Sequence, residues 1–114
     1  MFQFGLRIQN IKHAQLRLMC SKLNAHLFML HVKDSPSCAC GFDFEDCEHY
    51  LMQCPLFLVQ RQILHTNLQV IGQDLFNCNT LLYGSANLDL ETNYQIFSAV
   101  HKFITDTDRL LLDI

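Results

Sequence analysis

The chain has 114 residues, half of them hydrophobic, and a formal net charge of −3. This length and composition indicate one compact domain and exclude disordered or collagen-like chains, as well as polymerases, kinases and dehydrogenases, which need longer chains. No run of about 18 apolar residues occurs, and the first residues lack the order of a signal peptide. We therefore expect an intracellular protein, in the nucleus or the cytoplasm, with no membrane partner.

Charge is divided unevenly along the chain. Residues 1–33 carry five basic residues and no acid, whereas the other 81 residues carry three basic residues and eleven acids. Lysine and arginine are the side chains with which proteins contact the phosphates of RNA and DNA. The candidates for such contacts are Arg7, Lys12, Arg17, Lys22 and Arg61. The alternative for the basic segment is an ordinary solvated helix face.

The first helical region is expected over Lys12–His31. Its apolar residues recur at spacings of three and four, as on one stripe of a helix. The stripe consists of Leu16, Met19, Leu23, Leu27 and Leu30. The pattern predicts one long helix or two short ones, broken near Cys20–Ser21. Asp34–Ser37 then has the composition of a turn, and residues 38–48 that of an irregular acidic loop.

Four further segments follow this loop. A short helical stretch is expected from about Glu48 to Cys54, and Pro55 begins a helix that runs to about Val70. The apolar segment Leu75–Tyr83 is a further helix candidate. The last helix has a capping-type start at Asp89, Glu91 and Thr92. Its apolar stripe consists of Ile96, Val100, Phe103, Ile104, Thr107 and Leu111. No segment alternates with period two for long enough to form a sheet, so the fold is predicted to be all-α.

One constellation of residues has the spacing of a metal site. Its members are Cys38, Cys40, His49 and Cys54, in the pattern C-x-C-x8-H-x4-C. Three thiolates and one imidazole suit a structural Zn²⁺ ion, which takes four protein ligands and keeps no open position. Gly41 permits a tight loop after the first pair, and Pro55 stops the helical stretch that carries the second pair. We predict a zinc ion that staples the loop to this second helical segment.

Alternatives exist for several of these side chains. Cys47 lies two residues before His49 and is a competing ligand, and the thiols are also compatible with disulfides or with no metal at all. Cys20 and Cys78 are expected to be small buried side chains. The other histidines have no partner at ligand spacing and are expected to be satisfied or exposed: His13, His26, His31, His65 and His101. The acids of the loop are expected to form its solvated face: Asp43, Glu45, Asp46 and Glu48.

Motifs of catalysis are missing from the sequence. It contains no glycine-rich phosphate loop, no Gly-x-Ser-x-Gly and no His-Glu-x-x-His. A small redox protein that uses Cys47 or Cys20 is the remaining enzymatic alternative. We therefore assign no catalytic residue and expect the chain not to be an enzyme.

Several stretches resemble one family. Ser21–Phe28, Asp34–Gly41 and Glu45–Phe57 resemble the C-terminal tail of reverse transcriptases from non-LTR retrotransposons of the jockey type, and Leu81–Ser85 and Asn93–Arg109 are similar to that tail as well. In the family, this region follows the polymerase fingers, palm and thumb and carries a Cys-Cys-His-Cys motif similar to a zinc knuckle. The resemblance implies a role in holding template RNA or target DNA near the polymerase. The polymerase motif Tyr-x-Asp-Asp does not occur here, so polymerisation is not expected of this chain alone.

These observations give two functional hypotheses for a single domain, 1–114. The first is a zinc-binding accessory domain of a retroelement reverse transcriptase that contacts RNA or DNA. It would comprise a basic helical segment (1–33), a zinc-knuckle-like motif (34–57) and C-terminal helices (58–114). The alternative is a structural module that docks on a reverse transcriptase core or on a second copy of itself, or a degenerate retroelement fragment with no activity of its own.

Overall fold

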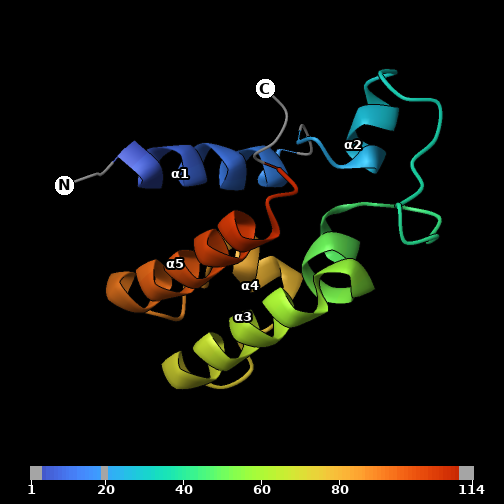
Figure 1. The fold of residues 1–114 in the computed structure, drawn as a ribbon. Coiled ribbons are helices and arrows are strands. Elements are labelled where there is room, and N and C mark those ends of the chain that lie inside the picture. The colour runs from blue at the N-terminus through green and yellow to red at the C-terminus, as the bar shows by residue number, and fades with distance from the viewer. Residues whose placement is uncertain (1–3, 19–20, 111–114) are drawn as a thin grey trace.

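A computed structural model describes residues 4–18 and 21–110, with side chains described from Asn10 onward (Figure 1). All regular structure in these residues is helical. The elements are α1 (Phe4–Arg17), α2 (Asn24–Met29), a π-helical turn η1 (His49–Gln53), a 3₁₀ turn η2 (Pro55–Phe57), α3 (Leu58–Ile71), α4 (Cys78–Tyr83) and α5 (Leu90–Thr107). The all-α prediction is confirmed for the described ranges. No helix within them is long and apolar enough to cross a membrane.

The first helical region is two helices, as one of the two alternatives predicted. The first helix begins earlier than expected, at Phe4, and ends at Arg17, and the second begins at Asn24. Because the chain bends between them, the predicted apolar stripe is divided: Leu16 and Leu23 are buried, whereas Leu30 is exposed. Two residues of this prediction, Met19 and Cys20, lie outside the described residues.

Helix α5 is the centre of the fold. It packs against α1, α3 and α4, and Figure 1 shows it lying between α1 and α3. Its N-terminus is capped by Asp89, whose side chain accepts a hydrogen bond from Thr92 N at 2.8 Å, as the sequence indicated. The predicted stripe is its buried face, because Ile96, Val100, Phe103 and Ile104 are fully buried. Leu111, the last predicted member, is outside the described part of the chain.

A lobe at one end of this bundle carries the cysteine-rich loop. Figure 1 shows α2 and the following loop beside the bundle, with η1 between the loop and α3. Two backbone hydrogen bonds hold the loop in place: Ala25 N donates to Glu45 O at 3.1 Å, and Glu45 N donates to Pro36 O at 2.7 Å. η1 is tied to α5 by Tyr50, whose hydroxyl lies 2.6 Å from Thr107 Oγ1. The loop therefore faces a helical turn that the core already fixes.

Candidate metal centre

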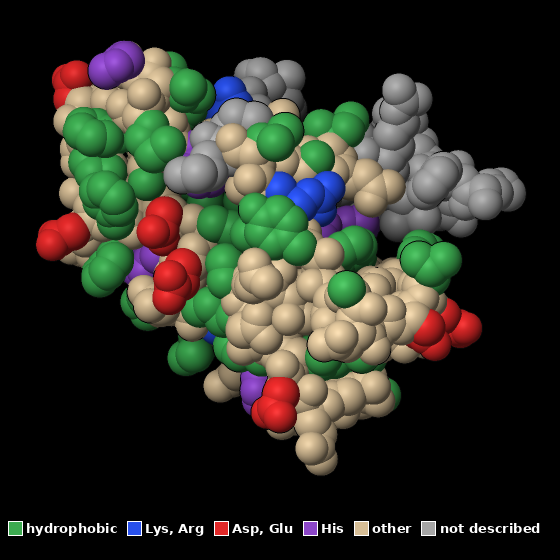
Figure 2. Space-filling model, turned by 180° about the vertical axis from the view of Figure 1, so that it is seen from behind, with side chains coloured by type: hydrophobic (Ala, Val, Ile, Leu, Met, Phe, Trp, Pro, Cys, Tyr) green, Lys and Arg blue, Asp and Glu red, His purple; other side chains and the backbone are tan. Residues whose placement is uncertain are grey.

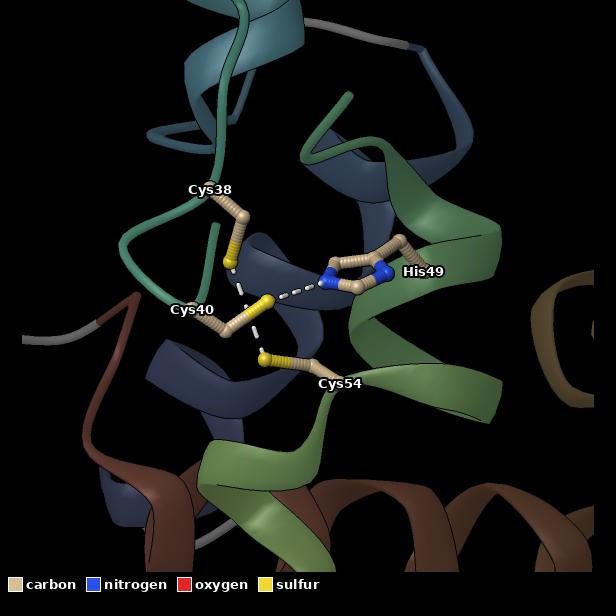
Figure 3. A group of neighbouring side chains, drawn as sticks. All are labelled: Cys38, Cys40, His49 and Cys54. Atoms are coloured by element: carbon tan, nitrogen blue, oxygen red, sulfur yellow. Dashed lines mark hydrogen bonds between the residues drawn. The ribbon is translucent and has the colours of Figure 1, made fainter. Parts of the chain in front are cut away.

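The four predicted ligands come together in space. Cys38, Cys40, His49 and Cys54, called the ligand cluster below, each offer one donor atom, and these atoms all lie within 4.8 Å of one another (Figure 3). The sulfurs of Cys38 and Cys54 are 3.7 Å apart, and Cys40 Sγ is 3.3 Å from His49 Nε2. Two sulfurs that are each about 2.3 Å from one tetrahedral ion are about 3.8 Å apart. The cluster therefore has the size and the donor set of a metal site.

A tight turn presents the first two ligands. Gly41 N donates to Cys38 O at 3.0 Å, and Cys38 N donates to Phe42 O at 2.9 Å. Gly41 has a φ of 102°, in a region that side chains disfavour. This is the role the sequence predicted for Gly41, since the turn brings both thiols to the same side of the loop (Figure 3).

The π-helical turn presents the other two ligands. Cys54 N donates to His49 O at 2.8 Å, a bond from residue i+5 to residue i. This turn is wider than an α-helical one, and Figure 3 shows the side chains of His49 and Cys54 pointing to the same space. Asp46 stabilises the start of the turn, because its Oδ1 accepts a hydrogen bond from His49 N at 2.9 Å.

Backbone amides surround the three sulfurs. The amide of Cys40 donates to the sulfur of Cys38, that of Phe42 to Cys40 and that of Leu56 to Cys54. Burial raises the pKa of the Cys38 and Cys54 thiols, and the amide donors act against this rise. The pKa of Cys40 is lowered, chiefly by the Phe42 amide. Such donors favour thiolates, the form in which cysteine binds metal ions.

The imidazole of His49 is held in an unusual way. The side chain is buried and directs Nε2 toward the sulfurs, while its buried Nδ1 has no hydrogen-bond partner within the described structure. The ring of Phe42 stacks on it, with ring centroids 4.5 Å apart and an interplanar angle of 6°. Nε2 is therefore the donor atom that His49 offers, and stacking covers one face of its ring.

Together these four side chains can hold a metal ion. Comparisons of the chain with protein-family models, curated proteins and solved structures found no match. What the chain does is therefore inferred from its own residues.

The competing thiol, Cys47, lies outside the ligand cluster. It is half-buried, and its thiol interacts with that of Cys78, the first residue of α4. This interaction, together with burial, raises the pKa of Cys47. Cys78, predicted to be buried, is half-buried against the core, and Cys20 falls outside the described ranges. In this geometry Cys47 contacts another element of the bundle and not the ligand cluster.

Arg61 has a structural role that the sequence analysis missed. The side chain is only 8% exposed, and its guanidinium donates to three backbone carbonyls: Tyr50 O at 2.9 Å, Leu51 O at 2.9 Å and Cys54 O at 2.7 Å. These carbonyls lie at the end of η1, where a helix leaves its last acceptors unpaired. Arg61 therefore fixes the backbone that carries Cys54, and because its guanidinium is directed at these carbonyls, the structure gives the predicted phosphate contact no support.

The acidic loop is only partly solvated. Asp43 and Glu48 are exposed as predicted, but Glu45 is buried and forms an ion pair with Arg109. Glu45 also accepts a hydrogen bond from Asn24 N at 2.7 Å, at the start of α2. The prediction of a solvated face is therefore wrong for Glu45, because a long-range basic partner compensates for its burial.

The remaining phosphate candidates differ in how far they are exposed. Arg17 is half-buried and donates to Leu82 O at 3.0 Å, Lys12 is half-buried and Lys22 is exposed. The side chain of Arg7 lies outside the described residues.

The other histidines are satisfied or exposed, as expected. His31 and His65 are exposed, and His26 lies 2.7 Å from the hydroxyl of Ser21. His13 and His101 form a buried pair, with 3.2 Å between His13 Nδ1 and His101 Nε2. Their separation of 88 residues left no local signal for this contact.

Proposed function

We propose that the ligand cluster binds one structural zinc ion, which fastens the cysteine-rich loop to the helical bundle. The main support is that three sulfurs and one imidazole nitrogen lie within 4.8 Å of one another. Zinc prefers this mixture of ligands, and a site with four protein ligands leaves no position for a substrate. The amide donors to the sulfurs support the same assignment, since they favour the thiolate form.

The two halves of the cluster differ in how firmly the rest of the fold holds them. His49 and Cys54 sit on η1, which Arg61 and the Tyr50 hydroxyl connect to α3 and α5. Cys38 and Cys40 sit on a loop with few buried neighbours, as its exposure indicates. A metal ion bound by both halves would hold the loop against η1. The free energy of metal binding would then contribute to the stability of the fold.

Elemental analysis of the purified protein tests this proposal. We expect about one zinc per chain, lost in Cys38→Ser, Cys40→Ser, His49→Ala and Cys54→Ser. Cys47→Ser is the matched control and should keep the metal, because Cys47 lies outside the ligand cluster. A metal-free protein that is equally stable would contradict the proposal.

We infer that the domain is an accessory part of a retroelement reverse transcriptase and contacts RNA or DNA through its first third. The support is the resemblance of three stretches to the tail of these enzymes, Ser21–Phe28, Asp34–Gly41 and Glu45–Phe57, and the absence of acids from residues 1–33. Only a few cations are available, so the affinity should be weak and should fall steeply with salt. Fluorescence anisotropy of zinc-loaded protein with labelled RNA and DNA at low salt is the test. No association with either would contradict this role.

The second candidate function is docking on another protein, and exposed apolar side chains favour it. Six large apolar side chains are exposed on α2 and on the loop after it: Phe28, Met29, Leu30, Val32, Phe42 and Phe44. In Figure 2, hydrophobic side chains gather with acidic ones on the lobe at the left of the view. Contiguous apolar surface is typical of contact sites. Sedimentation velocity should show association that grows with concentration if the partner is a second copy, and a strict monomer would contradict self-association.

A further inference from the structure

Phe42 contacts three of the four members of the ligand cluster. Its carbonyl accepts a hydrogen bond from Cys38 N at 2.9 Å, and its amide donates to the sulfur of Cys40. Its ring lies parallel to that of His49. One residue thus connects the loop half of the cluster to the ligand on η1.

The stacked ring takes the place of a hydrogen bond that His49 does not make within the described part of the chain. A histidine that binds a metal usually donates its second ring N–H to a carboxylate, a carbonyl or water, and this bond fixes the plane of the ring. In His49 the second nitrogen, Nδ1, is buried, and none of the described residues gives it such a partner. The parallel ring of Phe42, 4.5 Å away between centroids, is therefore the contact that sets the plane of the imidazole.

We propose that Phe42 is a positioning residue of the metal centre, whose ring holds the imidazole of His49 in the orientation that directs Nε2 to the ion. This inference rests on the proposed zinc site. It also accounts for a large apolar side chain on an exposed loop, because one face of the ring covers the ligand although 48% of the residue is exposed.

The chain offers a matched control two residues further along the loop. Phe44 is of the same type and is 46% exposed, but it lies outside the stack on His49. Substitution by leucine removes the flat ring at either position and leaves the backbone hydrogen bonds of residue 42 available. A difference between Phe42→Leu and Phe44→Leu therefore reports the ring contact and not a general loss of apolar surface.

The experiment measures zinc affinity by competition with a chromophoric chelator and records the visible spectrum of the Co²⁺-substituted protein. Phe42→Leu should weaken zinc binding about tenfold or more, the range seen when the orienting partner of a ligand is lost, and should alter the Co²⁺ bands. Phe44→Leu should match the wild type in both measurements. Phe42→Tyr keeps an aromatic ring and should restore the wild-type affinity and spectrum.

The outcomes separate this inference from the zinc site itself. A wild-type protein that binds no zinc would overturn both. Zinc binding in the wild type with equal affinity in Phe42→Leu and Phe44→Leu would overturn the role of Phe42 and leave the zinc site standing. If Phe42→Leu fails to fold by circular dichroism, Phe42→Tyr decides, because a tyrosine variant that binds zinc as poorly as a ligand substitution would contradict positioning by the ring.

Discussion

Glu45 and Arg109, 64 residues apart in the sequence, form a forked ion pair between the loop of the metal centre and the end of α5. Arg109 Nε donates to Glu45 Oε2 at 2.8 Å, and Nη2 donates to Oε1 and also to Lys22 O at 3.0 Å. The glutamate side chain is 4% exposed and that of the arginine 26%. This pair therefore joins three segments, the loop, the start of α2 and the C-terminal end of the bundle.

Glu45→Gln should destabilise the fold. Removal of one partner from a buried pair leaves the other charge uncompensated, and we expect a loss of about 2–3 kcal/mol, less than in a fully buried pair because Arg109 is partly exposed. Urea unfolding measures this loss. Glu48→Gln is the control, since Glu48 belongs to the same acidic segment and is exposed. Equal losses in both variants would attribute the effect to net charge and not to the pair.

Arg61→Met should be destabilising although it retains an apolar stem of similar length. Three carbonyls at the end of η1 would lose their donors, and we expect a loss of about 2–4 kcal/mol from buried acceptors left without a partner. Lys102→Met is the control, because Lys102 pairs with Asp106 on the surface and such pairs contribute about 0–1 kcal/mol. If the two variants unfold at the same urea concentration, the carbonyl bonds of Arg61 contribute little to stability.

Chelation of zinc should loosen one part of the molecule and leave the rest folded. At a free zinc concentration of about 1,000 times Kd, the ion contributes about 4 kcal/mol, so its removal should lower the melting temperature by about 15 °C in a domain of this size. Hydrogen exchange should accelerate within residues 34–57, while α3 and α5 stay protected by their own packing. Cys54→Ser should reproduce this pattern and Cys78→Ser should not. If protection from hydrogen exchange fell equally along the whole chain, zinc would not act locally on residues 34–57.

The buried histidine pair should make stability depend on pH. His13 Nε2 donates to Leu81 O at 2.8 Å, so Nδ1 is left to accept from His101 Nε2. Burial, with a smaller contribution from the charge of the neighbouring Arg17, lowers the pKa of both rings, that of His13 to about 4 although its hydrogen bond to Leu81 O acts against the change. An unfolded histidine binds its proton near pH 6.5. The unfolded chain therefore binds more protons below that pH, and stability should fall as the pH decreases from about 6.5 toward 4.

His13→Gln should flatten this dependence. Between about pH 7.5 and 5 the wild type should lose about 2 kcal/mol relative to the variant. Unfolding free energies of zinc-saturated protein between about pH 7.5 and 5 give the two slopes, and their difference isolates the pair from other titrating groups. His65→Gln changes an exposed histidine and should keep the wild-type slope. A His13→Gln slope equal to that of the wild type would contradict the role of the pair.

Local patterns predicted the parts of the fold that local interactions determine. The stripe of α5 and its Asp89 cap follow from residues within one or two helical turns, and the cysteine and histidine spacing identified the ligand cluster. The position of Arg61 could not be predicted in the same way. Its partners are carbonyls of another turn, which carry no side-chain signature. The ion pair of Glu45 and Arg109 forms because the end of α5 meets the loop in the folded structure. In the sequence, each of the two residues is indistinguishable from an ordinary surface charge.

The number of residues between His49 and Cys54 depends on the type of helical turn that carries them, and His49–Gln53 is a wide π-helical turn. In an α-helix, side chains share a face at separations of three or four residues, whereas His49 and Cys54 are five apart and meet because the backbone bond spans five residues as well. The same pair of donors would fit a regular α-helical turn if the chain were one residue shorter at this point. Proteins that share this centre can therefore differ by one residue between the histidine and the last cysteine, and a search with a fixed interval would overlook them.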